Sequence, residues 1–128
     1  MQTQNIVQSF VAAEAITEFA LVSIDANGKI TITDAGTDAK CVGVAQRACD
    51  SGDTVEVVVH GTTKVVASAA LTFATTPILA ATTNGEVKAV ASTEYPVCRV
   101  LPNINQVSTA AQGEQFLVLF TGPVEVKA

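Results

Sequence analysis

The sequence predicts a mainly β protein that folds as a single compact β-sandwich or β-barrel-like domain. Three observations support this fold class: strand-favouring residues dominate the composition, short alternating runs are separated by turn residues, and the order of these runs occurs twice. The 128 residues are 48% hydrophobic but include only five Phe, one Tyr and no Trp, so Val, Ala and Thr supply much of the chain. A chain of this length can bury enough surface to fold without a metal or a disulfide.

The longest β-branched run covers residues 52–67 and is interrupted once, by Gly61. Val55, Val57 and Val59 alternate with mixed residues, which predicts a strand with one apolar face. Glycine adopts positive φ at little cost, whereas the β-branched residues around Gly61 do not. The pattern therefore predicts two strands joined by a tight hairpin turn at residues 60–62.

Shorter runs predict the other strands in chain order. A hairpin is expected where the turn at residues 25–28 separates residues 19–24 from residues 29–33. Residues 41–45 form the next strand candidate, while the Ala- and Thr-rich residues 68–76 fit either a helical turn or an extended segment. Further strands are expected over residues 77–80, 86–90, 97–101 and 113–120.

The order of events in the first half recurs in the second half. Leu21 and Ile78, Gly28 and Gly85, and Cys41 and Cys98 are each 57 positions apart, and the Gly-acid pairs that begin at residues 52 and 113 are 61 apart. Four added residues in the second copy fit the loop at residues 102–106, where insertion costs little. The sequence therefore predicts two repeated β units, duplicated within one domain.

Residues 1–13 are Gln-rich and then apolar, and no helix cap or turn precedes them. We interpret them as an extended N-terminal arm, followed by a β-rich domain over residues 14–128. The arm carries four apolar side chains, Ile6, Val7, Phe10 and Val11, which are too many for a solvated tail. These four residues are the predicted contact site for a partner surface.

Charge excludes several classes of partner. The formal net charge is −5, and the seven Lys and Arg residues are scattered along the chain, which argues against binding to nucleic acid. No apolar stretch reaches the length that spans a membrane, and the first basic residue is Lys29, so no export signal is recognised. We therefore expect neither a nucleic-acid nor a membrane partner.

The three cysteines, Cys41, Cys49 and Cys98, form an odd number and contain no Cys-x-x-Cys pair. A reducing compartment would keep them as thiols. Cys41 and Cys98 stand among Val and Ala and are predicted to be small buried residues. Cys49 stands beside polar turn residues and is predicted to be more exposed.

Catalytic and cofactor motifs are missing from the sequence. The single histidine, His60, lies in a strand pattern without a Gly-x-Ser-x-Gly elbow, and no glycine-rich phosphate loop occurs. Residues 25–30 begin like a calcium loop, but Lys29 occupies a ligand position. The acidic residues cluster at turns, where they face water. We predict no enzymatic activity, no metal site and no cofactor, leaving an enzyme based on His60 and Cys49 as a remote alternative.

The order of five segments resembles the capsid decoration, or cement, proteins of tailed double-stranded DNA bacteriophages. The segments are residues 19–22, 27–30, 41–45, 51–61 and 113–120, and the likeness extends over roughly residues 14 to 121. The carrying motifs are the Val-Gly-Val-Ala strand, the Gly-acid turn into a β-rich strand that ends in glycine, and a second Gly-acid turn before the last strand. The loop at residues 102–112 and the three cysteines depart from that pattern.

This resemblance implies a virion protein on the outer surface of the head that clamps neighbouring major capsid subunits, commonly as a homotrimer, without enzymatic activity. The acidic charge agrees with a position outside the packaged DNA, and a trimer gains avidity by engaging several subunits at once. The alternative function is a free-standing β-module for cell-surface or carbohydrate binding, such as a head fibre or an adhesin fragment. Against carbohydrate binding, Tyr95 is the only aromatic residue with a hydroxyl.

Overall fold

The computed structural model describes residues 6–36, 40–72, 78–100 and 109–122 of the chain. These residues are almost entirely strands and turns, with one 3-10 turn, η1 (Thr83–Gly85), and no α-helix among them. The predicted mainly β fold class is therefore confirmed. The strands are β1 (Ile6–Val11), β2 (Leu21–Ile24), β3 (Ile30–Ile32), β4 (Cys41–Ala45), β5 (Thr54–Val66), β6 (Leu71–Thr72), β7 (Ile78–Ala81), β8 (Val87–Ala89), β9 (Cys98–Val100), β10 (Thr109–Ala110) and β11 (Gln115–Phe120).

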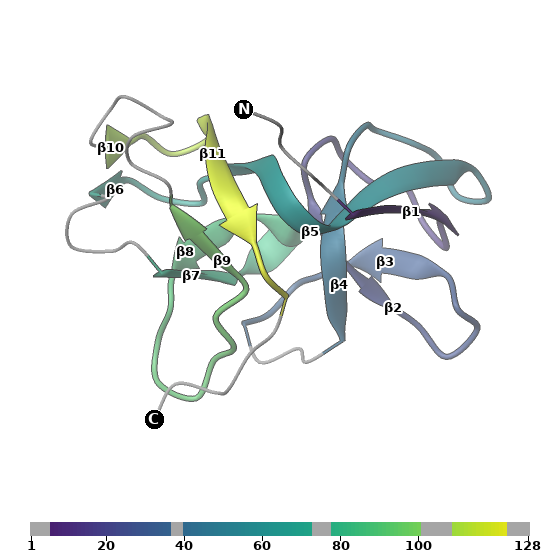
Figure 1. Cartoon of the computed structure of the whole chain (residues 1–128), viewed down its shortest axis with the longest axis horizontal. Coiled ribbons are helices and arrows are strands. Elements are labelled where there is room, and N and C mark those ends of the chain that lie inside the picture. The colour runs from purple at the N-terminus through teal and green to yellow at the C-terminus, as the bar shows by residue number, and fades with distance from the viewer. Residues whose placement is uncertain (1–5, 37–39, 73–77, 101–108, 123–128) are drawn as a thin grey trace.

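Nine of these strands form one curled antiparallel sheet that resembles half a barrel, and β6 pairs with β10 in a small second sheet. The strand order is β3-β2-β4-β5-β11-β9-β7-β8, with β1 paired to β5 beside this path. Figure 1 shows β5 running between a group made of β1 to β4 and a group made of β6 to β11. The long strand β5 is thus the element that joins the two groups.

The strand order confirms the predicted duplication. Reading outward from β5 gives β4, β2 and β3 on one side, and reading outward from β11 gives β9, β7 and β8 on the other. We define the first unit as residues 6–60 and the second unit as residues 61–122, within the described ranges. Leu21 and Ile78 begin β2 and β7, and Ile30 and Val87 begin β3 and β8, so both strand pairs are 57 positions apart.

The cysteine match in the predicted repeat is wrong by two positions. Gly43 lies opposite Val22, whereas Cys98 lies opposite Leu79, so Cys98 corresponds to Gly43, 55 positions earlier, and not to Cys41. A register shift between Val22 and Ser23 in the β2–β4 pairing accounts for one of the two positions. Gly43 cannot carry a side chain because a Cβ atom there would lie 2.4 Å from the Val57 Cγ1 atom. The proposed insertion at residues 102–106 lies outside the described residues.

The segment predicted as an arm contains the first strand of the first unit. β1 pairs antiparallel with residues 54–60 of β5, as residues 61–66 of β5 pair with β11. Beyond the strands, Ala12 forms a parallel bridge with Ile30, and Ala67, 55 positions later, forms the same bridge with Val87. β1 therefore corresponds to the second half of β5. The division of the chain into an arm at residues 1–13 and a domain at residues 14–128 stays a prediction.

The predicted hairpin at residues 60–62 is wrong, because residues 54–66 form one strand of 13 residues. Gly61 has a φ of 134°, a conformation that glycine adopts easily and β-branched residues do not. Its backbone lies opposite Phe120, at the point where β5 leaves β1 and begins to pair with β11. Glycine here lets the strand pass from one unit to the next without reversing its direction.

Each unit has its own hydrophobic core. The first core lies within the first unit and includes Val22, Ala45 and Val57, while the second core combines second-unit residues such as Val65 and Phe120 with Leu21, Cys41 and Val44 of the first unit. Strands β2 and β4 of the first unit are therefore buried on both faces, whereas the outer face of β1 is exposed. The undecided segment at residues 68–76 contributes β6 to this region, and its residues 73–76 lie outside the described part of the chain.

Cys41 and Cys98 are buried as predicted, and Cys49 is more exposed than either, at 9% against 3% and 2%, but it is buried too. Cys49 accepts a 2.9 Å hydrogen bond from the Ile16 backbone N–H and donates its own N–H to the Ile16 carbonyl oxygen at 3.0 Å. This pair of bonds turns the Cys49 side chain into the first core. Ile16 and Cys49 thus take the positions that Leu71 and Ala110 take in the β6–β10 sheet.

Replacing Val57 by Asp should prevent folding or lower the free energy of unfolding by more than about 4 kcal/mol, because it buries an unpaired carboxylate. Val57 is fully buried in the first core. Glu56→Gln is the matched control, since the neighbouring side chain is exposed and its ion pair with Arg47 is solvated. Thermal unfolding followed by circular dichroism measures both variants. Equal melting temperatures would contradict the assignment of the two faces of β5.

Candidate functional site

The described residues contain no catalytic arrangement. His60 is exposed on β5, and no group of three or more His, Cys, Asp or Glu side chains in this part of the chain could hold a metal ion. No described helix is long and apolar enough to cross a membrane. The features that remain are surfaces: the exposed strand β1, the loop between β4 and β5, and a cavity between the two units.

The predicted contact residues all lie on β1, but they do not form one surface. Ile6, Val7 and Val11 are 58%, 48% and 38% exposed, and together with Ile78 they are the exposed large hydrophobic residues of the described chain. Phe10 differs because it is partly buried and packs against the first core. Three of the four predicted residues are therefore available to a partner, while Phe10 also stabilises the fold.

Strand pairing separates the two faces of β1. Val7 lies opposite Val58, and Val11 lies opposite Thr54, whereas Phe10 lies opposite the fully buried Val55. Residues opposite each other in an antiparallel ladder project to the same face. Val7 and Val11 therefore point away from the first core, and a register shift between Ile6 and Val7 redirects the end of the strand.

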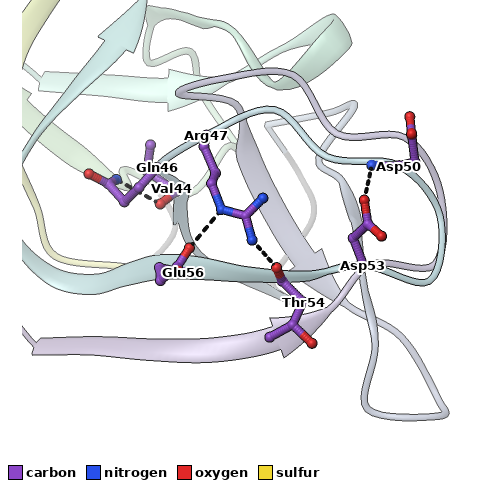
Figure 2. Close-up of polar contacts among 7 residues, drawn as sticks. All are labelled: Val44, Gln46, Arg47, Asp50, Asp53, Thr54 and Glu56. Carbon is purple, nitrogen blue, oxygen red and sulfur yellow. Dashed lines mark hydrogen bonds and ion pairs between the residues drawn. The ribbon is translucent and has the colours of Figure 1, made fainter.

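The loop between β4 and β5 lies beside this surface and is held by polar contacts (Figure 2). The Arg47 guanidinium donates to the Glu56 carboxylate, with a distance of 3.0 Å from Nε to Oε2, and also to the Thr54 carbonyl oxygen. The Asp50 backbone N–H donates to the Asp53 carboxylate at 3.0 Å. These contacts make the loop an ordered ridge of charged groups next to the exposed valines.

Glu56 remains ionised in this arrangement. A hydrogen bond with its own backbone, the hydrogen bond from Arg47 and the positive charge of Arg47 together hold the pKa of the Glu56 carboxyl below its usual range. Both side chains of the pair are about half exposed, so the pair orients the ridge more than it stabilises the fold. Sequence reasoning missed Arg47, because its partner lies nine residues away across a turn and no local motif joins them.

A cavity of about 350 Å³ lies at the seam between the units. Residues 17–20 and Ile32 line it from the first unit, and Val66 and residues 84–86 line it from the second. Phe19 adopts a φ of 60° and also packs against the second core, a backbone conformation that costs a non-glycine residue on the order of 1 kcal/mol. The lining offers two carboxylates, one hydroxyl and one amide, which are groups that can hydrogen-bond to a polar ligand.

The cysteines do not form a reactive centre. Cys41, Cys49 and Cys98 are buried free thiols. Burial raises the pKa of the Cys98 thiol well above its ordinary value, and the neighbouring Cys41 raises it further. Since the thiolate is the reactive form, Cys98 is a packing residue, as the sequence predicts.

Comparisons with known proteins show a likeness of fold. No protein-family model matches the chain, and no curated protein matches it. A solved structure with a similar fold is the N base of the head fibre gp8.5 of bacteriophage phi29, with a TM-score of 0.69 and 14% sequence identity. The match covers 95% of this chain and 99% of the other, so it includes both repeated units.

Burial of Cys98 has a consequence that depends on pH. The raised pKa stabilises the fold fully below the pKa of an unfolded thiol, about 8.5, and this contribution is lost as the pH rises toward the folded value. We expect the free energy of unfolding of the wild type to fall between pH 8 and pH 10 by more than that of Cys98→Ala, measured by urea titration. Identical pH dependence in the two proteins would contradict the burial of this thiol.

Proposed function

We propose that this chain is a virion protein of a tailed double-stranded DNA bacteriophage that attaches to the outer surface of the head as the base of a head fibre. The observation that carries the proposal is the similarity of fold to the head fibre base of phi29 over nearly the full length of both chains. The order of sequence motifs shared with head decoration proteins supports the same location independently. The role is structural and not enzymatic, in keeping with the surfaces described above.

The partner in this proposal is the major capsid protein, and the attached form is a homotrimer. The net charge of −5 favours the exterior of the shell over contact with packaged DNA, because like charges repel. Three linked copies engage several capsid subunits at once, so weak individual contacts add up to firm attachment.

A second candidate is the cement function, in which the protein clamps neighbouring capsid subunits and stabilises the shell. The motif order that resembles decoration proteins favours it. The two functions differ in what the protein does for the head. A cement protein raises the temperature at which heads disrupt, whereas a fibre base leaves that temperature unchanged and carries a further projecting part.

The outward face of β1 is the surface that we assign to the shell. Val7 and Val11 are 48% and 38% exposed and lie beside the charged ridge held by Arg47, Glu56 and Thr54. Apolar residues bordered by charged groups are typical of the centre and rim of a protein interface. Ile6, at the end of the same strand, extends this apolar surface.

Replacing both Val7 and Val11 by Ser should weaken attachment to heads without unfolding the protein. Burying the exposed part of each valine contributes about 1 kcal/mol, so the double variant should bind roughly 30-fold more weakly per subunit. The measurement is co-sedimentation of purified protein with heads that lack it, together with the melting temperature of the free protein.

Val90→Ser is the control, because Val90 is partly exposed in the second unit and lies outside the assigned surface. We expect it to bind heads like the wild type. Full retention of the double variant on heads would remove β1 from the attachment surface, and failure of the wild type to bind any head would overturn the proposed function.

A further inference from the structure

We infer that copies of this chain bind one another head to tail, with the open core of the first unit of one copy seated on the outer face of the second unit of the next. The chain already contains one contact of this kind, between its own two units. The inference rests on the repeat and on burial alone, and it holds whether or not the protein attaches to a phage head.

The contact inside the chain serves as the template. Leu21 and Val44 lie opposite each other on the outer face of the first unit's sheet, and both are fully buried. They belong to the second core, together with Val65, Val97 and Phe120 of the second unit. The core of the second unit is thus closed by the outer face of the first.

The corresponding outer face of the second unit is only partly covered: Ala80 on this face of β7 is fully buried, whereas the row that contains Ile78 is not. The ladder places Leu21, Val44 and Val58 in one row across the first unit, and it places Ile78, Arg99 and Leu119 in the equivalent row across the second. The first row is 0–2% exposed. In the second row Ile78 is 36% exposed, Arg99 is exposed and Leu119 is partly exposed.

The core of the first unit is open in the same way. Val65, Val97 and Phe120 of the second unit are at most 1% exposed. Their equivalents in the first unit, 55, 55 and 61 positions earlier, are Phe10, Val42 and Val59, which are only partly buried at the edge of the first core. Within the described residues, no further unit packs on the first core as Leu21 and Val44 pack on the second, which accounts for the difference.

The two open faces are therefore of the two kinds that pack together within the chain. One is an incompletely covered core, and the other is the type of sheet face that covers such a core within the same chain. Charge agrees with this pairing: Glu14 lies at the rim of the open core, where its carboxylate accepts a 2.8 Å hydrogen bond from the Ile32 N–H, and Arg99 stands on the exposed outer face. A contact between unlike faces is heterologous and closes into a ring when its rotation allows, of which a trimer is one case.

The test is the mass of the full chain in solution, measured by light scattering over a range of concentrations. We expect the wild type to form a closed oligomer. Ile78→Asp on the outer face and Val59→Asp at the open core should each raise the dissociation constant at least a hundredfold and yield monomers. Ala26→Asp, in the exposed turn between β2 and β3, is the control and should assemble like the wild type.

Mixing the two monomeric variants distinguishes a head-to-tail contact from a symmetric one. Each variant retains one intact face, so an equimolar mixture should form a one-to-one dimer and nothing larger. A symmetric interface that pairs one face with the same face of another copy would be damaged in only one variant, so the other variant would still assemble on its own. A mixture that stays monomeric therefore overturns the inference, as does a wild type that is monomeric at all concentrations.

Exposed charges provide a second test that does not depend on how the core variants fold. Arg99→Glu and Glu14→Arg should each weaken assembly, and the chain that carries both changes should recover it, because each contact then regains an opposite pair. Failure of the double variant to assemble better than the single variants would overturn the proposed orientation of the two faces. Both outcomes are measured on the free protein. The proposed function is tested separately, by binding to heads.

Discussion

The fold depends on one constraint, which is that β5 belongs to two units at once. Its first half pairs with β1 and β4, and its second half pairs with β11. Since the strand continues through Gly61 without a loop, the second unit must begin where the first unit ends. The outer face of the first unit then closes the second core, and neither unit can keep its buried surface without the other. Folding should therefore be cooperative across both units.

Burial on two faces explains why equivalent strands of the two units have different patterns of buried residues. In the first unit, Leu21 and Val22 are adjacent and both fully buried, and so are Val44 and Ala45, because each face of that sheet meets a core. In the second unit, the buried residues Cys98 and Val100 flank the exposed Arg99. A strand buried on both faces has a continuous apolar run, and a strand buried on one face alternates. The equivalent strands β4 and β9 therefore differ in pattern because the second core covers the outer face of the first unit.

Local sequence patterns predicted the strands well, but they did not predict how consecutive strands connect or in which register they pair. Residues 41–45 were expected to form a strand and do so with the same bounds, and the turn before Lys29 is fixed by the Asp25 carboxylate, which accepts hydrogen bonds from two backbone N–H groups. The hairpin at Gly61 was wrong because a glycine at positive φ permits either a reversal or a bend, and long-range pairing with β11 decides between them. The cysteine match was wrong because the register between paired strands is set by the partner strand and is not visible in β4 or β9 alone. The contact site on β1 stays a prediction: its residues were chosen for their apolar character, and the opposite orientation of Phe10 from Val7 and Val11 required the ladder.

The repeat also allows the burial of a residue in one unit to be compared with the burial of its equivalent in the other unit. Burial of an exposed apolar residue is usually judged against average proteins, in which scattered surface hydrophobics are normal. Here the paired strand positions have an equivalent in the same chain, so a difference in burial between two equivalents points to a difference in what packs against them. Phe10 and Val65 occupy the same place in their units, yet only Val65 is fully covered. The first unit packs on the second core and covers Val65. Within the described residues nothing packs on the first core in the same way, and Phe10 is therefore left partly exposed.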